Sequence, residues 1–233
     1  MFKHKLLAAV ALASLALVSI AQAAVPTLQM QLSSGAATSG ILTDTLHTGQ
    51  LTYNASLGVF TILVATGTGV GSANPGGGNT IDLNSVQVTA AAAGSLTIQL
   101  TETNLTGPAT GLTNIASVIG GTLGSINKGN STLTFSTYID TANVAFAATT
   151  LVNTQSFTGA GVPIGSSVTT GKTTGALFSE TIIVTINSAA NSTTSFDGFM
   201  TPIAVPEPGS MLTLGAGLMA LGAVRRRKQK AAA

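Results

Sequence analysis

The stretch Glu180-Thr181-Ile182-Ile183-Val184-Thr185-Ile186-Asn187 decides the fold class of this 233-residue chain. All six residues from 181 to 186 carry a branch at Cβ. Such side chains lose χ1 freedom in a helix and fit well on a pleated surface. The stretch therefore predicts a β-strand.

Further strand-like runs lie on both sides of this stretch. Short runs alternate apolar side chains with Thr, Ser, Gln or Asn, and Gly-rich or Asn-rich segments separate the runs. A period of two indicates strands with one dry face and one wet face. We expect strands near residues 28–32, 50–54, 59–65, 81–89, 95–103, 132–138, 143–149, 151–157, 180–187 and 193–200.

About ten strands without a helical period between them favour an all-β fold, an antiparallel β-sandwich of jelly-roll or immunoglobulin-like type. Gly-containing pairs such as Gly120-Gly121 and Asp197-Gly198 predict turns. Residues 106–130 lack a clear strand, so we expect a surface excursion and a binding loop there. The expected bulky core residues are Phe60, Phe135, Phe146, Phe157, Phe178, Phe196 and Phe199.

Charge is scarce and unevenly placed. Seven of the nine basic residues lie in the two terminal segments, whereas residues 24–204 hold two lysines and six acidic residues, which gives 2 − 6 = −4. Nucleic-acid binding needs a cationic face, so we exclude it. The chain has no cysteine, which excludes disulfides and thiolate metal sites.

Two Gly-containing segments resemble nucleotide loops only superficially. The first, residues 67–71, lacks the following helix that would direct its amides at a pyrophosphate. The second, residues 165–173, has five residues between its glycines where a phosphate-binding loop needs four, so we interpret it as a polar hairpin.

Catalytic and metal sites find little support in the residue pattern. His47 lies three residues after Asp44, but no nucleophile elbow accompanies the pair. Two oxygen-rich groups could contact calcium at a turn, although neither matches the dense calcium-loop pattern. These groups are Asn79, Asp82 and Asn84, and Asp140 and Asn143. We predict no catalytic, cofactor-binding or metal-binding residues.

The first 23 residues have the three parts of a secretory signal peptide. Lys3 and Lys5 form a cationic start, residues 6–20 are apolar, and Ala21 and Ala23 supply the small side chains that signal peptidase requires. We expect a signal helix, export through the Sec translocon and cleavage after Ala23. The apolar run is shorter than the roughly 20 residues that span a bilayer, which disfavours a permanent anchor.

The C-terminal segment has an equally ordered arrangement. Val205, Pro206, Glu207 and Pro208 come first, and the prolines hold this peptide extended. An apolar stretch then predicts a short transmembrane helix at about 208–224. Arg225, Arg226, Arg227 and Lys228 open a basic tail, residues 225–230, that stays on the cytoplasmic side.

Residues 205–233 together resemble the PEP-CTERM sorting signal of Gram-negative bacteria. The resemblance implies that an exosortase recognises Pro206-Glu207-Pro208, cuts nearby and releases a transiently inner-membrane-anchored protein to the cell surface or an exopolysaccharide matrix. Tails of this type are also catalogued under an ice-binding C-terminal label. That label does not extend to the body, because its Thr-x-Thr pairs fall at irregular intervals.

The predicted organisation is a signal peptide at 1–23, an extracytoplasmic β-sandwich at 24–204 and a sorting and anchor segment at 205–233. Our first hypothesis is a non-enzymatic surface or matrix protein with a structural or interaction role in the envelope or biofilm. The alternative is a carbohydrate-binding or adhesive module, although Tyr53 and Tyr138 are the only tyrosines and Trp is absent. A secreted hydrolase fits less well, because histidines and paired carboxylates are few.

Overall fold

The computed structural model describes residues 25–69, 80–107, 112–203 and Met219. The predicted signal peptide and its cleavage residues, the sorting motif and the basic tail lie outside the described residues, and so does the predicted transmembrane helix except for Met219. Within the described ranges, no helix combines the length and apolarity needed to cross a bilayer.

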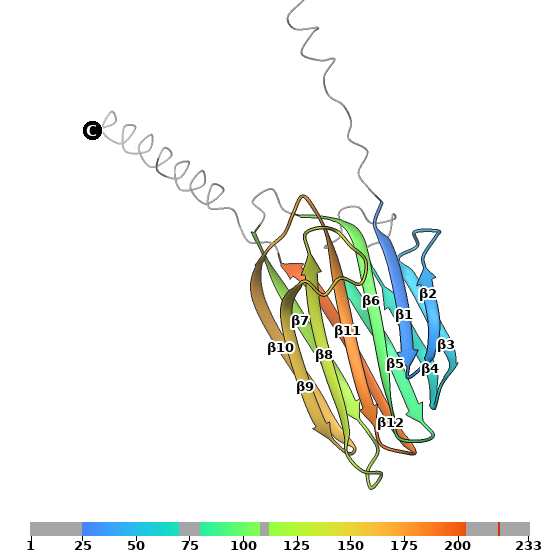
Figure 1. Cartoon of the computed structure of the whole chain (residues 1–233). Helices are drawn as coiled ribbons and strands as arrows, with labels where there is room; N and C mark the ends of the chain where they lie inside the picture. The colour runs from blue at the N-terminus through green and yellow to red at the C-terminus, as the bar shows by residue number, and fades with distance from the viewer. Residues whose placement is uncertain (1–24, 70–79, 108–111, 204–218, 220–233) are drawn as a thin grey trace, which may run out of the picture.

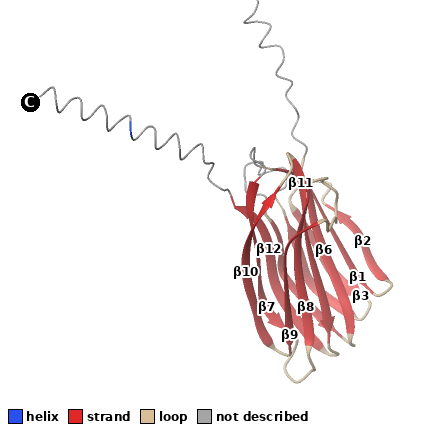
Figure 2. Ribbon diagram, turned by 60° about the vertical axis from the view of Figure 1, so that its left-hand side comes forward, coloured by secondary structure: helices blue, strands red, loops and turns tan. Residues whose placement is uncertain are grey.

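Twelve strands in the described ranges form two six-stranded antiparallel sheets, which pack face to face (Figures 1 and 2). The first sheet has the order β2-β1-β6-β11-β8-β9, and the second has the order β10-β7-β12-β5-β4-β3. The predicted all-β antiparallel sandwich is confirmed. The strands are β1 (Thr27–Ser34), β2 (Ala37–Thr43), β3 (Gln50–Leu57), β4 (Phe60–Thr68), β5 (Ile81–Ala90), β6 (Gly94–Thr106), β7 (Leu112–Leu123), β8 (Ser131–Asp140), β9 (Thr150–Gly159), β10 (Val162–Thr173), β11 (Leu177–Ser188) and β12 (Ser192–Ile203).

The β-branched stretch forms most of β11, which lies inside the first sheet between β6 and β8. Ile182, Val184 and Ile186 alternate toward the core and are fully buried. The core also contains Phe60, Phe135, Phe178 and Phe196, as predicted, and Phe157 packs against its margin. Burial of these side chains between the two sheets is the main source of stability.

Residues 143–149 do not form the predicted strand. They belong to the connection between β8 and β9, which crosses the outer side of the first sheet (Figure 1). Asp140 fixes its course, because the carboxylate accepts hydrogen bonds from the Val144 N–H, 2.9 Å, and from the Thr149 hydroxyl, 2.8 Å. Phe146 lies in this connection, half-buried and outside the core cluster, so its expected core role is wrong.

Residues 106–130 are not a surface excursion, because they contain β7, an interior strand between β10 and β12. Gly120-Gly121 lies within that strand and is not a turn. A Cβ at Gly121 would lie 2.2 Å from the Ser195 carbonyl oxygen, so glycine permits a close backbone approach here. The predicted polar hairpin at 165–173 is also wrong, because β10 runs straight through it. The remaining unpredicted strand is β2.

Candidate functional site

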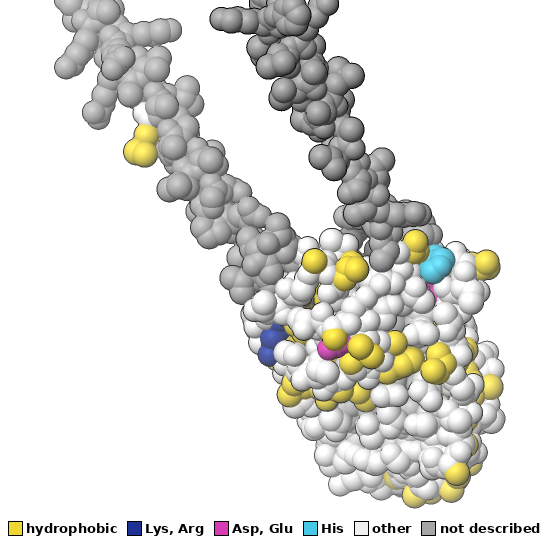
Figure 3. Space-filling model, turned by 45° about the horizontal axis from the view of Figure 1, so that its top comes forward, with side chains coloured by type: hydrophobic (Ala, Val, Ile, Leu, Met, Phe, Trp, Pro, Cys, Tyr) yellow, Lys and Arg dark blue, Asp and Glu magenta, His cyan; other side chains and the backbone are white. Residues whose placement is uncertain are grey.

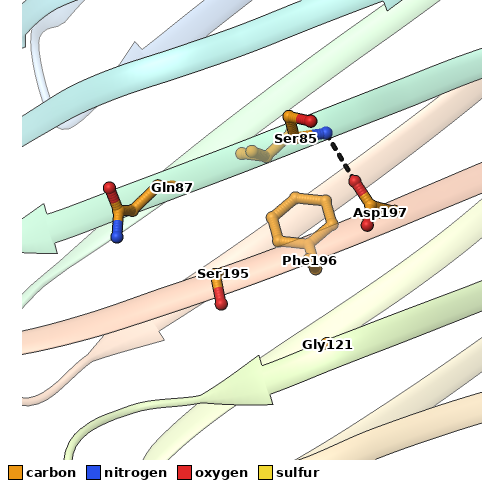
Figure 4. A pocket seen from close by; sticks show the side chains of 7 residues that line it. Ser85, Gln87, Gly121, Ser195, Phe196 and Asp197 are labelled. Carbon is orange, nitrogen blue, oxygen red and sulfur yellow. Dashed lines mark hydrogen bonds between the residues drawn. The ribbon is translucent and has the colours of Figure 1, made fainter.

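A shallow hollow of about 280 Å³ lies on the outer face of the second sheet, where β5, β12 and β7 run side by side (Figure 4). Side chains from β5 and β12 provide its polar groups, and the backbone of β7 borders it. The lining residues are Ser85, Val86, Gln87, Gly121, Ser195, Phe196 and Asp197.

A β-bulge creates the hollow. Val86 pairs with Phe196, whereas the next pair along is Leu83 with Gly198, so Asn84 and Ser85 together face the single residue Asp197. The Ser85 N–H donates a hydrogen bond to Asp197 Oδ1, 2.5 Å, as Figure 4 shows. This bond holds the bulge and directs the Asp197 carboxylate across the β5–β12 junction.

The hollow belongs to a longer row of polar side chains along β5 and β12. Their cross-strand pairs are, in order, Thr89 with Thr193, Gln87 with Ser195, Ser85 with Asp197, Asp82 with Phe199, and Thr80 with Thr201. The threonine pairs at the two ends are hydrogen-bonded through their hydroxyls, at 3.1 Å and 2.6 Å. We call these ten residues the polar row. Phe199, predicted as a core residue, is half-buried in this row instead.

Asp82 is the electrostatically unusual member of the polar row. Burial raises the pKa of its carboxyl group, and the neighbouring negative charge of Asp197 raises it further. Asp82 Oδ1 is buried and has no hydrogen-bond partner. A carboxyl group of this kind accepts hydrogen bonds and, when protonated, can also donate one. Asp82 lies beside the hollow and does not line it.

The row can therefore make hydrogen bonds with a hydroxyl-rich ligand. It combines carboxylates, an amide and hydroxyls with one aromatic ring, and all of these residues except Thr80 lie on β5 or β12. The end of the molecule shown in Figure 3 carries few charged side chains among its described residues.

His47 and Asp44 lie in the connection between β2 and β3. A ring nitrogen must donate to a carbonyl, so His47 Nδ1 donates to the Pro26 oxygen, 3.0 Å. The Asp44 carboxylate accepts from the Thr48 hydroxyl, 3.2 Å, and from the Gly49 N–H, 2.6 Å. Burial alone would raise the pKa of Asp44, but these hydrogen bonds outweigh it and lower the pKa. Each of these bonds fixes the connection.

The two oxygen-rich groups also have local partners. Asn143 Oδ1 accepts from the Asn104 N–H, 2.7 Å, and Asp140 accepts the two bonds described above. Asp82 and Asn84 lie on β5, Asp82 within the polar row and Asn84 at the bulge, and Asn79 lies outside the described residues. Within the described part of the chain, no group of three or more histidine, aspartate or glutamate side chains could hold a metal ion.

A pair of glutamates is buried inside the sandwich. Glu102 on β6 and Glu180 on β11 are direct cross-strand partners, and both are fully buried. A Cβ on Gly69, which follows β4, would lie 2.6 Å from Glu102 Oε2, so this carboxyl group reaches the opposite sheet. Both Glu180 oxygens lack a hydrogen-bond partner. Burial, and then the charge of Glu102, raise the pKa of Glu180 well above its usual range.

Sequence reasoning missed the hollow. Asp197-Gly198 predicts a turn, but it lies inside β12 and forms the bulge. Ser85, Gln87 and Ser195 carry no sequence signal beyond strand alternation, since their approach depends on the pairing of β5 with β12. The residues of the predicted sorting motif, Val205 to Pro208, begin two positions after the end of β12 in the sequence and lie outside the described ranges.

Residues 204–228 match the family model of the PEP-CTERM protein-sorting motif. No curated protein matches the chain.

Several solved structures are similar at low identity. TmCBM61 in complex with beta-1,4-galactotriose is 12% identical with a TM-score of 0.35, and the match covers 68% of this chain and 90% of that one. The mannan-recognising carbohydrate-binding module TmCBM27 is 10% identical with a TM-score of 0.32, covering 66% and 86%. The K1 cleaved adhesin domain of Lys-gingipain from Porphyromonas gingivalis W83 is 10% identical with a TM-score of 0.31, covering 67% and 98%. Likeness at this level indicates nothing about ligand or activity.

Proposed function

We propose that this chain, which carries a PEP-CTERM sorting motif at residues 204–228, is an exosortase substrate that delivers a β-sandwich to the cell surface or to an exopolysaccharide matrix. The motif is the observation that carries the proposal. It begins directly after β12, which ends at Ile203, so the enzyme meets its signal immediately beyond the last strand.

Each part of the C-terminal segment has a role in this route. Pro206 and Pro208 lack backbone donors and keep the peptide around Glu207 extended for the exosortase. The apolar stretch at 208–224 holds the chain in the inner membrane for a limited time, and the basic residues from Arg225 stop translocation. Sec export and signal peptidase act on the N-terminal segment beforehand.

The body has a non-enzymatic role in this proposal. His47 and Asp44, the most plausible catalytic pair in the sequence, make bonds that fix the β2–β3 connection. The face shown in Figure 3 is largely uncharged, and it suits contact with hydrated polysaccharide better than contact with a charged partner.

Processing at the sorting motif is the first testable consequence. When the full-length gene is expressed in an exosortase-bearing Gram-negative host, we expect intact-mass measurement to find mature protein that lacks the segment from Arg225 to Ala233. Replacing Pro206, Glu207 and Pro208 together by Ala removes the recognised peptide and leaves the strands unchanged. This variant should stay in the inner membrane with its tail attached.

Two results would contradict the sorting proposal. One is a mature protein that retains the basic tail in that host, and the other is equal processing of the triple-alanine variant. Expression in a host without an exosortase is the matched control, because the same chain should then remain uncut.

The polar row favours a second candidate function, a carbohydrate-binding or adhesive module. Asp197, Gln87 and Ser195 border a hollow of about 280 Å³, and Phe199 lies beside them on the same face of β12. Sugar hydroxyls donate to carboxylates and accept from amides, so this arrangement suits a short stretch of glycan.

Glycan binding is tested with the mature protein on a glycan panel and on the host's own exopolysaccharide. If the polar row binds a sugar, Asp197→Asn should weaken saturable binding at least about tenfold, because a hydrogen bond to a charged group contributes about 1.5–3 kcal/mol. Asparagine keeps Oδ1, so the bond from the Ser85 N–H and the bulge persist. Thr52→Ala, at an exposed position on β3, should bind like the wild type. Absence of saturable binding would leave the structural role alone.

A further inference from the structure

We propose that the polar row selects glycans that carry no acidic groups, and that the negative charges of Asp82 and Asp197 impose this selection. The inference rests on the second candidate function, glycan binding at the polar row, and adds the class of glycan that the row accepts. Asp197 borders the hollow, as Figure 4 shows, and Asp82 lies beside the hollow on β5.

The two aspartates concentrate negative charge on one face of the second sheet. They are the only acidic residues in the described strands of that sheet, and they lie on the adjacent strands β5 and β12. Asp82 pairs with Phe199, two positions from Asp197 on β12, so both aspartates project from the same face. The charge of Asp197 raises the pKa of Asp82, so the two carboxyl groups are close enough to interact.

The described strands beside the two aspartates provide no compensating cation. β4 and β7, which flank β5 and β12, contain no charged residue. Lys172 is the single basic residue in the strands of this sheet, and it lies on β10. It is eight positions from Ile164, the partner of Gly121 at the hollow, which corresponds to about 26 Å at 3.3 Å per residue. This separation exceeds the Debye length of about 8–10 Å.

The other lysine of the body is also distant from the aspartates. Lys128 lies in the connection between β7 and β8, and its N–H donates to the Ser125 oxygen, 3.2 Å. The Ser125 N–H donates to Ser192 Oγ, 3.0 Å, and Ser192 lies five positions before Asp197 on β12, about 17 Å along the strand. The hollow is therefore surrounded by uncompensated negative charge.

This charge acts on the charge of a ligand. Proteins commonly bind carboxylate and phosphate groups through Arg or Lys, but the chain has no arginine before Arg225, and the polar row has no basic residue. An acidic sugar would add a third negative charge beside Asp82 and Asp197, whereas a hydroxyl group finds both donors and acceptors in the row. A protonated amine would be attracted by the same two aspartates. The polar row thus favours neutral or amine-bearing glycans over acidic ones.

Three matched oligosaccharides test this selection with the mature protein. The first is the neutral oligosaccharide that binds most tightly on the glycan panel. In the second its primary hydroxyls are oxidised to carboxylates, and in the third they are replaced by amines. At pH 7 and about 10 mM salt, we expect the carboxylate form to bind at least about tenfold more weakly than the neutral form, and the amine form to bind at least as tightly. About 1 M salt, where the Debye length is about 3 Å, should remove most of the difference.

Asp82→Asn separates charge from direct contact, because Asp82 lies beside the hollow and does not line it. The ratio of the affinities for the neutral and the carboxylate form should fall about threefold in this variant, since one of the two repelling charges is gone. Thr52→Ala, at an exposed position on β3 outside the polar row, should keep the wild-type ratio.

Two results would overturn the charge selection and leave glycan binding intact. One is a carboxylate form that binds as tightly as the neutral form, or a panel on which only acidic glycans bind. The other is an equal loss of affinity for the carboxylate and amine forms, because shape would then decide the selection. An unchanged affinity ratio in Asp82→Asn would overturn the role of Asp82. Absence of saturable binding to every glycan would overturn both the selection and the glycan-binding function.

Discussion

Replacing Phe135 by Ala should lower the free energy of unfolding by about 3–5 kcal/mol, the range for a buried phenylalanine whose cavity cannot close. Phe135 projects from β8 in the first sheet and is fully buried. A Cβ on Gly198 of β12 would lie 2.7 Å from the Phe135 ring, so the side chain spans the space between the two sheets. Urea denaturation of the mature protein measures the loss as a lower midpoint at constant slope.

Phe146→Ala is the matched control for this prediction. The two residues are the same type, but Phe146 lies half-buried in the β8–β9 connection and outside the core cluster. We expect its truncation to lower the free energy of unfolding by less than about 1 kcal/mol. Equal losses for the two variants would mean that the sandwich core has been placed wrongly.

The sequence predicted those strands whose inner faces are apolar. In β11 and β6 the residues that face the core are mostly Ile, Leu and Val. The expected positions of both strands agree with the structure. These strands suffice for the fold class, because period-two runs without helices leave a sandwich as the natural solution.

The strands that escaped prediction have polar or glycine residues where apolar ones would be expected. On β7, Thr113 and Ser117 are buried, and Ser117 accepts hydrogen bonds from the Thr137 hydroxyl at 3.1 Å and the Gln155 amide at 3.3 Å. These partners come from distant parts of the chain and compensate for the buried polar groups. A local pattern cannot show such partners, so the stretch looked like a loop.

The hollow escaped prediction for a related reason. Asp197-Gly198 has the composition of a turn, yet pairing with β5 on one side and β7 on the other makes it a bulge inside β12. Bulge position depends on register between strands about a hundred residues apart, and register is a property of the whole sheet.

Raising the pH above about 4.3 should lower the free energy of unfolding of this protein. Carboxyl groups with ordinary pKa values in the folded state would give no such decrease. A glutamate in the unfolded chain titrates near pH 4.3, whereas burial and the charge of Glu102 raise the pKa of folded Glu180 well above its usual range. The folded state therefore holds a proton that the unfolded state has lost. This contribution to stability is complete below about pH 4.3 and is lost as the pH rises toward and through the folded pKa.

Other carboxyl groups also change the free energy of unfolding with pH. The pKa of Asp82 is raised, as that of Glu180 is, so its contribution is likewise lost as the pH rises. Asp44 and Asp140 act in the opposite sense: burial alone would raise their pKa values, but hydrogen bonds in the folded state lower them, so their contribution is present above about pH 4 and is lost as the pH falls. We therefore expect maximal stability in mildly acidic solution.

Glu180→Gln isolates the buried pair. Glutamine has nearly the same shape and no proton to lose, so the fall in unfolding free energy with pH, which can approach about 1.4 kcal/mol per pH unit for one proton, should become much shallower. At pH 8 the variant should be more stable than the wild type, because folded Glu180 must either keep a proton that the unfolded chain has lost or place a second charge next to Glu102. Asp82→Asn should remove only the smaller part of the fall in unfolding free energy with pH, since Asp82 is half-buried at the outer face.

Urea denaturation from pH 4 to pH 9 compares the wild type with these two variants. A wild-type profile that rises steadily with pH, or a Glu180→Gln profile that matches the wild type, would show that Glu180 is charged in the folded protein.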